Sequence, residues 1–76
     1  MDSSVVIRVI AEQLGIDEKE INENTAFAEL GADSLDLFQI ISALEEEFDI
    51  EFEDSDVEEI KTVGEAIDYI RGIVEQ

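Results

Sequence analysis

Cysteine and histidine are both absent from this sequence. Without thiols and imidazoles, the chain has no thiol nucleophile, no imidazole base and no disulfide, and it lacks the usual ligands of a closed zinc site. Any chemistry that its side chains perform therefore rests on carboxylates and hydroxyls.

Basic residues are scarce as well. The chain has 4 lysines and arginines against 22 aspartates and glutamates, which gives a formal net charge of −18 at pH 7. Nucleic acids and anionic membrane surfaces are themselves polyanions, so association with them would gain nothing from counterion release. The charge instead favours a partner that presents a basic protein surface.

The length limits what the fold can enclose. A chain of 76 residues predicts one small domain over residues 1–76, which we expect to be a monomer. A domain of this size buries roughly 60% of the surface that the unfolded chain exposes, which leaves little room for both a core and a deep substrate pocket. A carrier or binding module is therefore favoured over an enzyme, and the hydrophobic fraction of 45% indicates that a core can form.

The first residues carry no targeting pattern. Met1–Ser4 contains no basic residue, and the apolar run Val5–Ile7 is interrupted by Arg8. Neither a signal peptide nor a membrane-spanning helix is predicted, so the expected location is the cytoplasm.

Apolar residues at helical spacing predict three long helices. The first covers Ser4–Leu14, and the second covers Leu35–Phe48 with Asp33 or Ser34 as its N-terminal cap. The last covers Val63–Val74. The apolar stripes of these helices are Val6, Ile7, Ile10 and Leu14; Leu37, Ile41, Leu44 and Phe48; and Val63, Ile67, Ile70 and Val74.

The segments between these helices lack a sustained period. Residues 15–33 form a long connection that begins with Gly15, a typical C-terminal cap. Isolated apolar residues anchor this connection: Ile16, Ile21, Phe27 and Leu30. Residues 50–52 are interpreted as an extended linker, because no second strand is available to pair with them.

Two capping boxes complete the architecture. Ser55 with Glu58 predicts the start of a short helix, and Thr62 with Glu65 predicts the start of the last helix, where Gly64 lowers the helix propensity slightly. The predicted fold class is all-α: a small four-helix bundle with three longer helices, a short third helix, and a long loop between helices one and two.

The many acids do not fit a specific metal site. The twelve-residue pattern of a calcium-binding loop can be aligned with its first position at Asp49 or at Asp54. The obligatory glycine at position six is then replaced by Asp54 in the first alignment and by Glu59 in the second. We therefore expect only weak, diffuse cation binding by the acidic face. A hydrolase built on two carboxylates needs one of them in an apolar cleft, and nothing in the sequence indicates such a cleft.

Ser34 differs from the other hydroxyl residues by its setting. It follows Gly31–Asp33 at the end of the long connection and opens the second helix, so its oxygen should lie exposed beside unpaired backbone N–H groups. A phosphate ester would be well placed there. Spacing alone nevertheless favours a simpler interpretation, a serine that caps the helix.

The segment Leu30–Asp36, with the sequence LGADSLD, resembles the modification motif of acyl carrier proteins. Glu12–Gly15, Ala43–Asp49 and Thr62–Ile70 are similar to the same family, so the resemblance covers nearly the whole chain. The fold that it implies, a four-helix bundle with a short third helix, agrees with the architecture predicted above.

The resemblance implies that Ser34, flanked by Asp33 and Leu35, carries 4′-phosphopantetheine, which a phosphopantetheinyl transferase moves from coenzyme A with magnesium. The thiol of this arm would hold an acyl group as a thioester, so the missing cysteine is no obstacle. The protein itself would not be an enzyme. Its partners would be fatty-acid synthesis enzymes with basic docking patches.

The resemblance further implies two sets of contact residues. The partner-binding set is Asp33, Asp36, Gln39, Glu45, Glu46, Glu47 and Asp49. The residues that would line a space for the acyl chain are Phe38, Ile41, Leu44, Phe48, Phe52, Ile60 and Ile67. For each apolar residue the simpler interpretation is ordinary core packing, and for each acid it is solubility.

Three departures from the family pattern affect the expected partners, one of which is that the loop before Leu30 is one residue short. Gln39 stands where many fatty-acid carriers have glutamate, and Phe52–Asp54 replaces a common Ile-Pro-Asp pattern. Carriers for polyketide, peptidyl or D-alanyl transfer are therefore alternatives, although the acidic second helix favours the stand-alone fatty-acid type. An acidic calcium-binding or protein-interaction module is an alternative of a different class.

Overall fold

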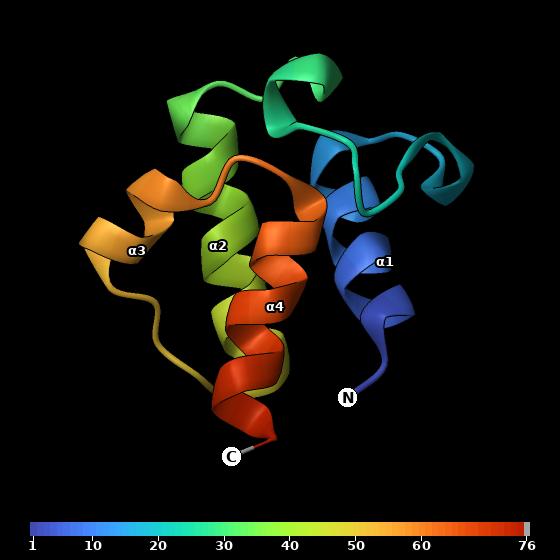
Figure 1. The fold of residues 1–76 in the computed structure, drawn as a ribbon. Coiled ribbons are helices and arrows are strands. Elements are labelled where there is room, and N and C mark those ends of the chain that lie inside the picture. Colours follow the sequence, from blue (N-terminus) through green and yellow to red (C-terminus); the bar gives the residue numbers. More distant parts are fainter. Residues whose placement is uncertain (76) are drawn as a thin grey trace.

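The computed structural model describes residues 1–75, which contain four α-helices, two short 3-10 helices and no strand. In chain order the elements are α1 (Ser3–Leu14), η1 (Glu18–Glu20), η2 (Phe27–Leu30), α2 (Ser34–Phe48), α3 (Asp54–Glu59) and α4 (Val63–Val74). Figure 1 shows α1 running opposite to α2 and α4, with the connection over residues 15–33 crossing one end of the bundle. The predicted all-α bundle with a short third helix is confirmed.

The helix ends agree with the predicted ones to within one residue for the three long helices. The first helix begins at Ser3 instead of Ser4, because the Asp2 carboxylate accepts a hydrogen bond from the amide of Ser4 at 2.9 Å and caps it. Gly15 has the left-handed conformation, with φ of 69°, and ends this helix as predicted. The second helix begins at Ser34 instead of Leu35.

One predicted capping box is confirmed and the other is wrong. Thr62 and Glu65 cap each other at the start of α4, with both hydrogen bonds between 3.1 and 3.2 Å. The Ser55 box does not form, because α3 already begins at Asp54 and Ser55 lies inside it. The acids in the first turn of α3 favour this start through the helix dipole. Residues 50–52 belong to the extended linker predicted for them.

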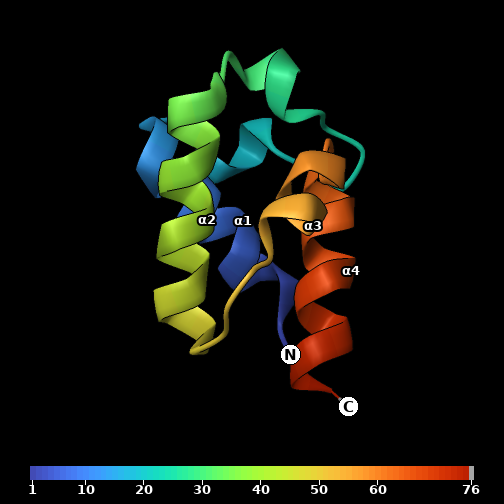
Figure 2. The same ribbon diagram turned by 90° about the vertical axis from the view of Figure 1, so that its left-hand side faces the viewer.

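The core lies between α1, α2 and α4, three helices that Figures 1 and 2 show packed side by side. The fully buried side chains are Val6, Ile10, Ile40, Leu44, Val63, Ile67 and Ile70. The predicted stripes supplied most of these residues but omitted Ile40. The stripe position of Val74 is wrong, because its side chain is 39% exposed at the end of α4. The neighbouring helices of a bundle cover the middle of each helix better than its ends, so a side chain at a helix end is more exposed.

The long connection docks on the start of α4. The hydrogen bonds run from Phe27 N to Lys61 O (3.0 Å), from Val63 N to Thr25 O (3.0 Å) and from Gly64 N to Glu23 O (2.8 Å). The first amides of a helix have no partner within it, so the carbonyls of the connection satisfy two of them. The same contacts hold Phe27 in the interior, where it is 4% exposed.

The contacts that attach the linker and α3 to the bundle include a ring stack and two hydrogen bonds. The ring of Phe52 stacks on that of Tyr69 in α4, with centroids 4.6 Å apart. The Tyr69 hydroxyl donates to a carboxylate oxygen of Asp56 in α3 at 2.9 Å. The amide of Phe52 donates to the Glu45 carboxylate in α2 at 2.8 Å. These contacts fix α3 over the space between α2 and α4 (Figure 2).

Tyr69 should therefore titrate above its ordinary range. Burial and the hydrogen bond to Asp56 raise the pKa of Tyr69 above the ordinary value of 10.0. Tyr69 is the only tyrosine and the chain has no tryptophan, so the absorbance of tyrosinate reports this residue alone. We expect a titration midpoint above the ordinary value in the folded chain, a return to it in urea, and a lower midpoint in Asp56→Asn.

The sign for stability follows from the same shift. Because the pKa of Tyr69 is higher in the folded state than in the unfolded state, its protonated hydroxyl contributes to the unfolding free energy. This contribution is complete at a pH below the unfolded pKa, and it is lost as the pH rises through the folded pKa. Unfolding free energy should therefore fall above pH about 10. In Tyr69→Phe this part of the fall should disappear. A midpoint of Tyr69 at or below the ordinary value would contradict the structure.

Candidate functional site

The N-terminus of α2 is built by two acids that cap each other. The amide of Asp36 donates to Oδ1 of Asp33 at 3.0 Å, and the amide of Asp33 donates to Oδ2 of Asp36 at 3.4 Å. Asp33 is therefore the cap, and Ser34 is the first helical residue, with an exposed side chain. The simpler interpretation of Ser34 as the capping residue is wrong. Its hydroxyl lies outside the cap.

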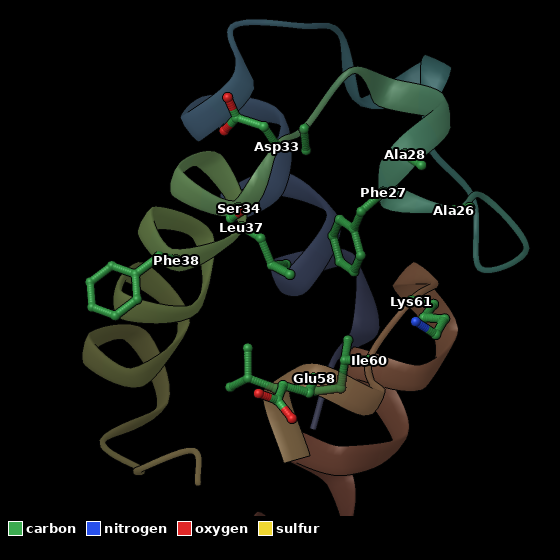
Figure 3. Close-up of a pocket in the computed structure, with 12 residues that line it drawn as sticks. Ala26, Phe27, Ala28, Asp33, Ser34, Leu37, Phe38, Glu58, Ile60 and Lys61 are labelled. Carbon is green, nitrogen blue, oxygen red and sulfur yellow. The ribbon is translucent and has the colours of Figure 1, made fainter. Parts of the chain in front are cut away.

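The position of Ser34 suits an anionic substituent. The amides of Ser34 and Leu35 lie in the first turn, where no carbonyl of the helix is available to accept from them. An anion beside such a helix end is stabilised by about 0.3–1 kcal/mol, while the carboxylates of Asp33 and Asp36 offset part of this. Figure 3 shows the Asp33 carboxylate pointing away from the pocket, which leaves the approach to Ser34 open. These residues fit an ester-linked phosphate.

An apolar pocket of about 580 Å³ adjoins Ser34. It lies between the start of α2, η2 and the end of α3. Its lining residues are Ala26, Phe27, Ala28, Ala32, Asp33, Ser34, Leu37, Phe38, Val57, Glu58, Ile60 and Lys61. In Figure 3 the side chains of Phe27 and Leu37 point toward each other across it. The volume is typical of a small-molecule site, and most of the lining is hydrocarbon.

The predicted acyl-chain residues are spread over several places. Only Phe38 and Ile60 belong to the pocket lining, and Figure 3 shows the Phe38 ring directed away from the cavity. The remaining candidates are packed elsewhere: Ile41, Leu44 and Ile67 are buried, while Phe48 and Phe52 are half-buried. The sequence prediction missed most of the lining, above all Phe27, Leu37 and Val57.

A signal for part of the missed lining is present in the sequence. Phe27 is an isolated aromatic residue in a polar connection, which marks it as an inward anchor. Leu37 belongs to the apolar stripe of α2, only one helical turn from Ser34. The positions of Phe27 and Leu37 in the pocket lining depend on how the connection over residues 15–33 docks on α4. The spacing of apolar residues in the sequence carries no information about that docking.

The predicted partner-binding residues have different surroundings. Asp33 and Asp36 are engaged in the helix cap. The Glu45 carboxylate holds the linker through the amide of Phe52, and Glu47 lies 3.4 Å from Arg8 of α1. Of the predicted residues, those exposed to solvent on α2 or at its ends are Asp33, Gln39, Glu46, Glu47 and Asp49. Some acids of this face therefore hold other parts of the chain in place, whereas others present their charge to solvent.

Two kinds of feature are not found among residues 1–75. No three acidic side chains there gather closely enough to hold a metal ion between them. In the same part of the chain, no helix has the length and apolar content needed to cross a bilayer.

The concentration of negative charge should make folding depend on salt. A net charge of −18 on so small a surface produces self-repulsion that dissolved ions screen. We expect added sodium chloride or magnesium to raise Tm by about 5 °C or more, which corresponds to roughly 1 kcal/mol for a domain of this size. Thermal melts followed by circular dichroism would measure it. Equal midpoints at low and high salt would refute the repulsion argument.

The family comparison agrees with this geometry. Residues 4–70 match the protein family described as the phosphopantetheine attachment site. The match spans most of the chain and contains both Ser34 and the elements around the pocket. Members of the family bear a covalently attached 4′-phosphopantetheine group, act as carriers, and depend on a phosphopantetheinyl transferase and on acyl-processing partners. The chain therefore belongs to the family of phosphopantetheine-bearing carrier proteins.

Proposed function

We propose that this chain is a stand-alone cytoplasmic carrier that holds acyl intermediates on a 4′-phosphopantetheine arm at Ser34 and delivers them to the enzymes of fatty-acid synthesis. The observation that carries the proposal is the setting of Ser34: an exposed hydroxyl, outside the helix cap, at the edge of an apolar pocket. The terminal thiol of the arm supplies the chemistry by holding the acyl group as a thioester.

Attachment of the arm is a phosphoryl-group transfer. The Ser34 oxygen would form a bond to the phosphorus that bears the pantetheine in coenzyme A and would lose its proton. The bond between this phosphorus and the bridging oxygen would break, so that adenosine bisphosphate leaves. The chain contributes an accessible nucleophile and the positive end of α2, and the transferase supplies the general base and the magnesium ion.

Other features of the chain support the same function. A flexible arm on a fixed serine raises the effective concentration of its cargo at any enzyme that has docked. The pocket beside Ser34 is apolar and wide enough to shelter part of a hydrocarbon chain. Gln39, Glu46 and Asp49 face solvent on or next to α2, where a basic patch on a partner can reach them. The chain itself performs no catalysis in this proposal.

The proposal is tested by incubating the purified chain with coenzyme A, magnesium and a phosphopantetheinyl transferase. We expect the intact mass to rise by one phosphopantetheine group. A known carrier modified in parallel shows that the transferase is active. An unchanged mass of this chain alongside a modified control would overturn the proposal.

The competing hypotheses give different results. An acidic calcium-binding module predicts saturable, stoichiometric calcium binding with a rearrangement of the helices, and no gain in mass. Carriers for polyketide, peptidyl or D-alanyl transfer predict the same gain in mass but a different cargo. Mass spectrometry of the chain purified from its native source would identify that cargo, and a series of saturated acyl groups would support fatty-acid synthesis.

A further inference from the structure

One basic side chain lies in the lining of the apolar pocket beside Ser34. Among residues 1–75 the charged members of this lining are Lys61 and the acids Asp33 and Glu58. Figure 3 shows the Lys61 nitrogen on the side of the residue that faces Phe27, whereas the Glu58 carboxylate is directed away from Phe27. The pocket therefore presents a cation to the group that it holds.

Lys61 has no acidic partner within the part of the chain that the structure describes. The chain has 4 basic residues, Arg8, Lys19, Lys61 and Arg71. Both arginines form ion pairs with neighbouring acids, and neither lysine does so with any of residues 1–75. In a chain with 22 acids, the Lys61 ammonium group is thus left available to an anion that comes from outside the fold.

The backbone holds the base of the Lys61 side chain at the pocket. The carbonyl oxygen of Lys61 accepts a hydrogen bond from the amide of Phe27 at 3.0 Å, and its own amide donates to the Glu65 carboxylate at 3.2 Å. Lysine can lay its methylene groups along an apolar wall while the ammonium group stays in water. The exposed Lys61 side chain is therefore confined to the rim of an otherwise apolar cavity.

We propose that this pocket selects acyl groups whose far end is a carboxylate, and that Lys61 is the residue that selects them. The inference rests on the proposed carrier function and names its preferred cargo. Figure 3 places Lys61 across the pocket from Ser34, beyond Leu37 and Phe27, so the far end of a tethered chain that crosses the pocket reaches Lys61. A methyl end gains only apolar contact there, whereas a carboxylate gains a charge-assisted hydrogen bond.

The negative charge of the chain opposes this preference but does not cancel it. Salt screens exposed charges that lie more than about 8–10 Å from the carboxylate, while a contact pair with Lys61 is screened much less. Glu58 lines the same pocket and offsets part of the attraction. Exposed ion pairs change an equilibrium constant by up to about fivefold, and we expect about threefold here.

Cleavage of the loaded thioester by hydroxylamine tests the inference. The transferase loads the chain from octanoyl-coenzyme A or octanedioyl-coenzyme A, whose acyl groups have the same number of carbons and end in a methyl group or a carboxylate. Cargo held in the pocket keeps the thioester from the reagent. Relative to the matching coenzyme A thioesters, we expect the octanedioyl form to react about threefold more slowly than the octanoyl form. Lys61→Gln should remove this difference, and Lys61→Arg should retain it.

Lys19→Gln is the matched control. It removes the same charge from another lysine that has no ion pair within residues 1–75, but in η1 and outside the pocket lining. The threefold difference should persist in Lys19→Gln, and Glu58→Gln should increase it.

Three results would overturn the inference while the carrier function stands. These are equal rates for the two wild-type forms, a difference that survives in Lys61→Gln, and a difference that Lys19→Gln removes as well, since the last would reflect net charge alone. A wild-type chain that the transferase cannot load from either coenzyme A thioester would instead disprove the carrier function, and the inference would be wrong with it.

Discussion

Ser34→Ala is expected to abolish the gain in mass that the transferase produces, whereas Ser42→Ala should be modified like the wild type. Both residues lie in α2, but only Ser34 stands at the exposed start of the helix beside the pocket. The loss should be complete, because no other hydroxyl residue lines this pocket and transfer needs a nucleophile at one fixed place. Intact-mass spectrometry of both variants measures the difference.

The Ser34→Ala variant should fold normally, so the loss would be chemical. Asp33 and Asp36 form the cap without the serine hydroxyl, and alanine is a good helix former. Its thermal midpoint should lie close to that of the wild type. If the variant still gains one phosphopantetheine group, another residue carries the arm and the assignment to Ser34 is wrong.

Gly64→Ala and Gly72→Ala should change stability in opposite directions, although both replace glycine by alanine in α4. A Cβ atom on Gly64 would lie 2.9 Å from the backbone carbonyl oxygen of Glu23, which cannot move without releasing the docked connection. Overpacking of this kind lowers the unfolding free energy by about 1–3 kcal/mol. The gain in helix propensity, about 1 kcal/mol, recovers only part of this loss. The expectation from sequence, that Gly64 merely lowers propensity, omits this contact.

Gly72 provides the internal control for that pair. Among residues 1–75, no atom outside the adjoining residues and the backbone of the same helix turn lies within 4 Å of a Cβ atom built at Gly72, so alanine there should stabilise the chain by about 0.5–1 kcal/mol. Urea unfolding at constant salt gives both free energies. Should the Gly64 variant prove as stable as the Gly72 variant, the close approach of the connection to α4 would be disproved.

Sequence periodicity predicts the helices because it depends only on which face each one buries. The bounds of α4 agree with the prediction at both ends, since the Thr62 box and the apolar period coincide there. The choice between Asp33 and Ser34 as the cap of α2 could not be made in the same way. Both residue types accept amide hydrogen bonds, and only the conformation shows which one does.

The pocket was harder to predict than the helices. Its walls come from η2, α2 and the end of α3, which are distant in sequence and brought together by the hydrogen bonds between the connection and residues 61–64. The role of Glu45 was missed for a related reason. Composition assigns every acid to solvent, but this carboxylate is fixed by an amide seven residues later, in a linker with no period of its own.

The pairing of the connection with the start of α4 also determines how the pocket can widen. Phe27 and Lys61 belong to two different walls of the pocket. A backbone hydrogen bond of 3.0 Å joins these residues, so the two walls are held together as one unit. The first turns of α2 form the opposite wall. This wall is connected to the unit that contains Phe27 through side-chain contacts and the short segment 31–33. Any widening of the pocket would therefore have to come from the side chains that meet across it or from a shift between this wall and that unit.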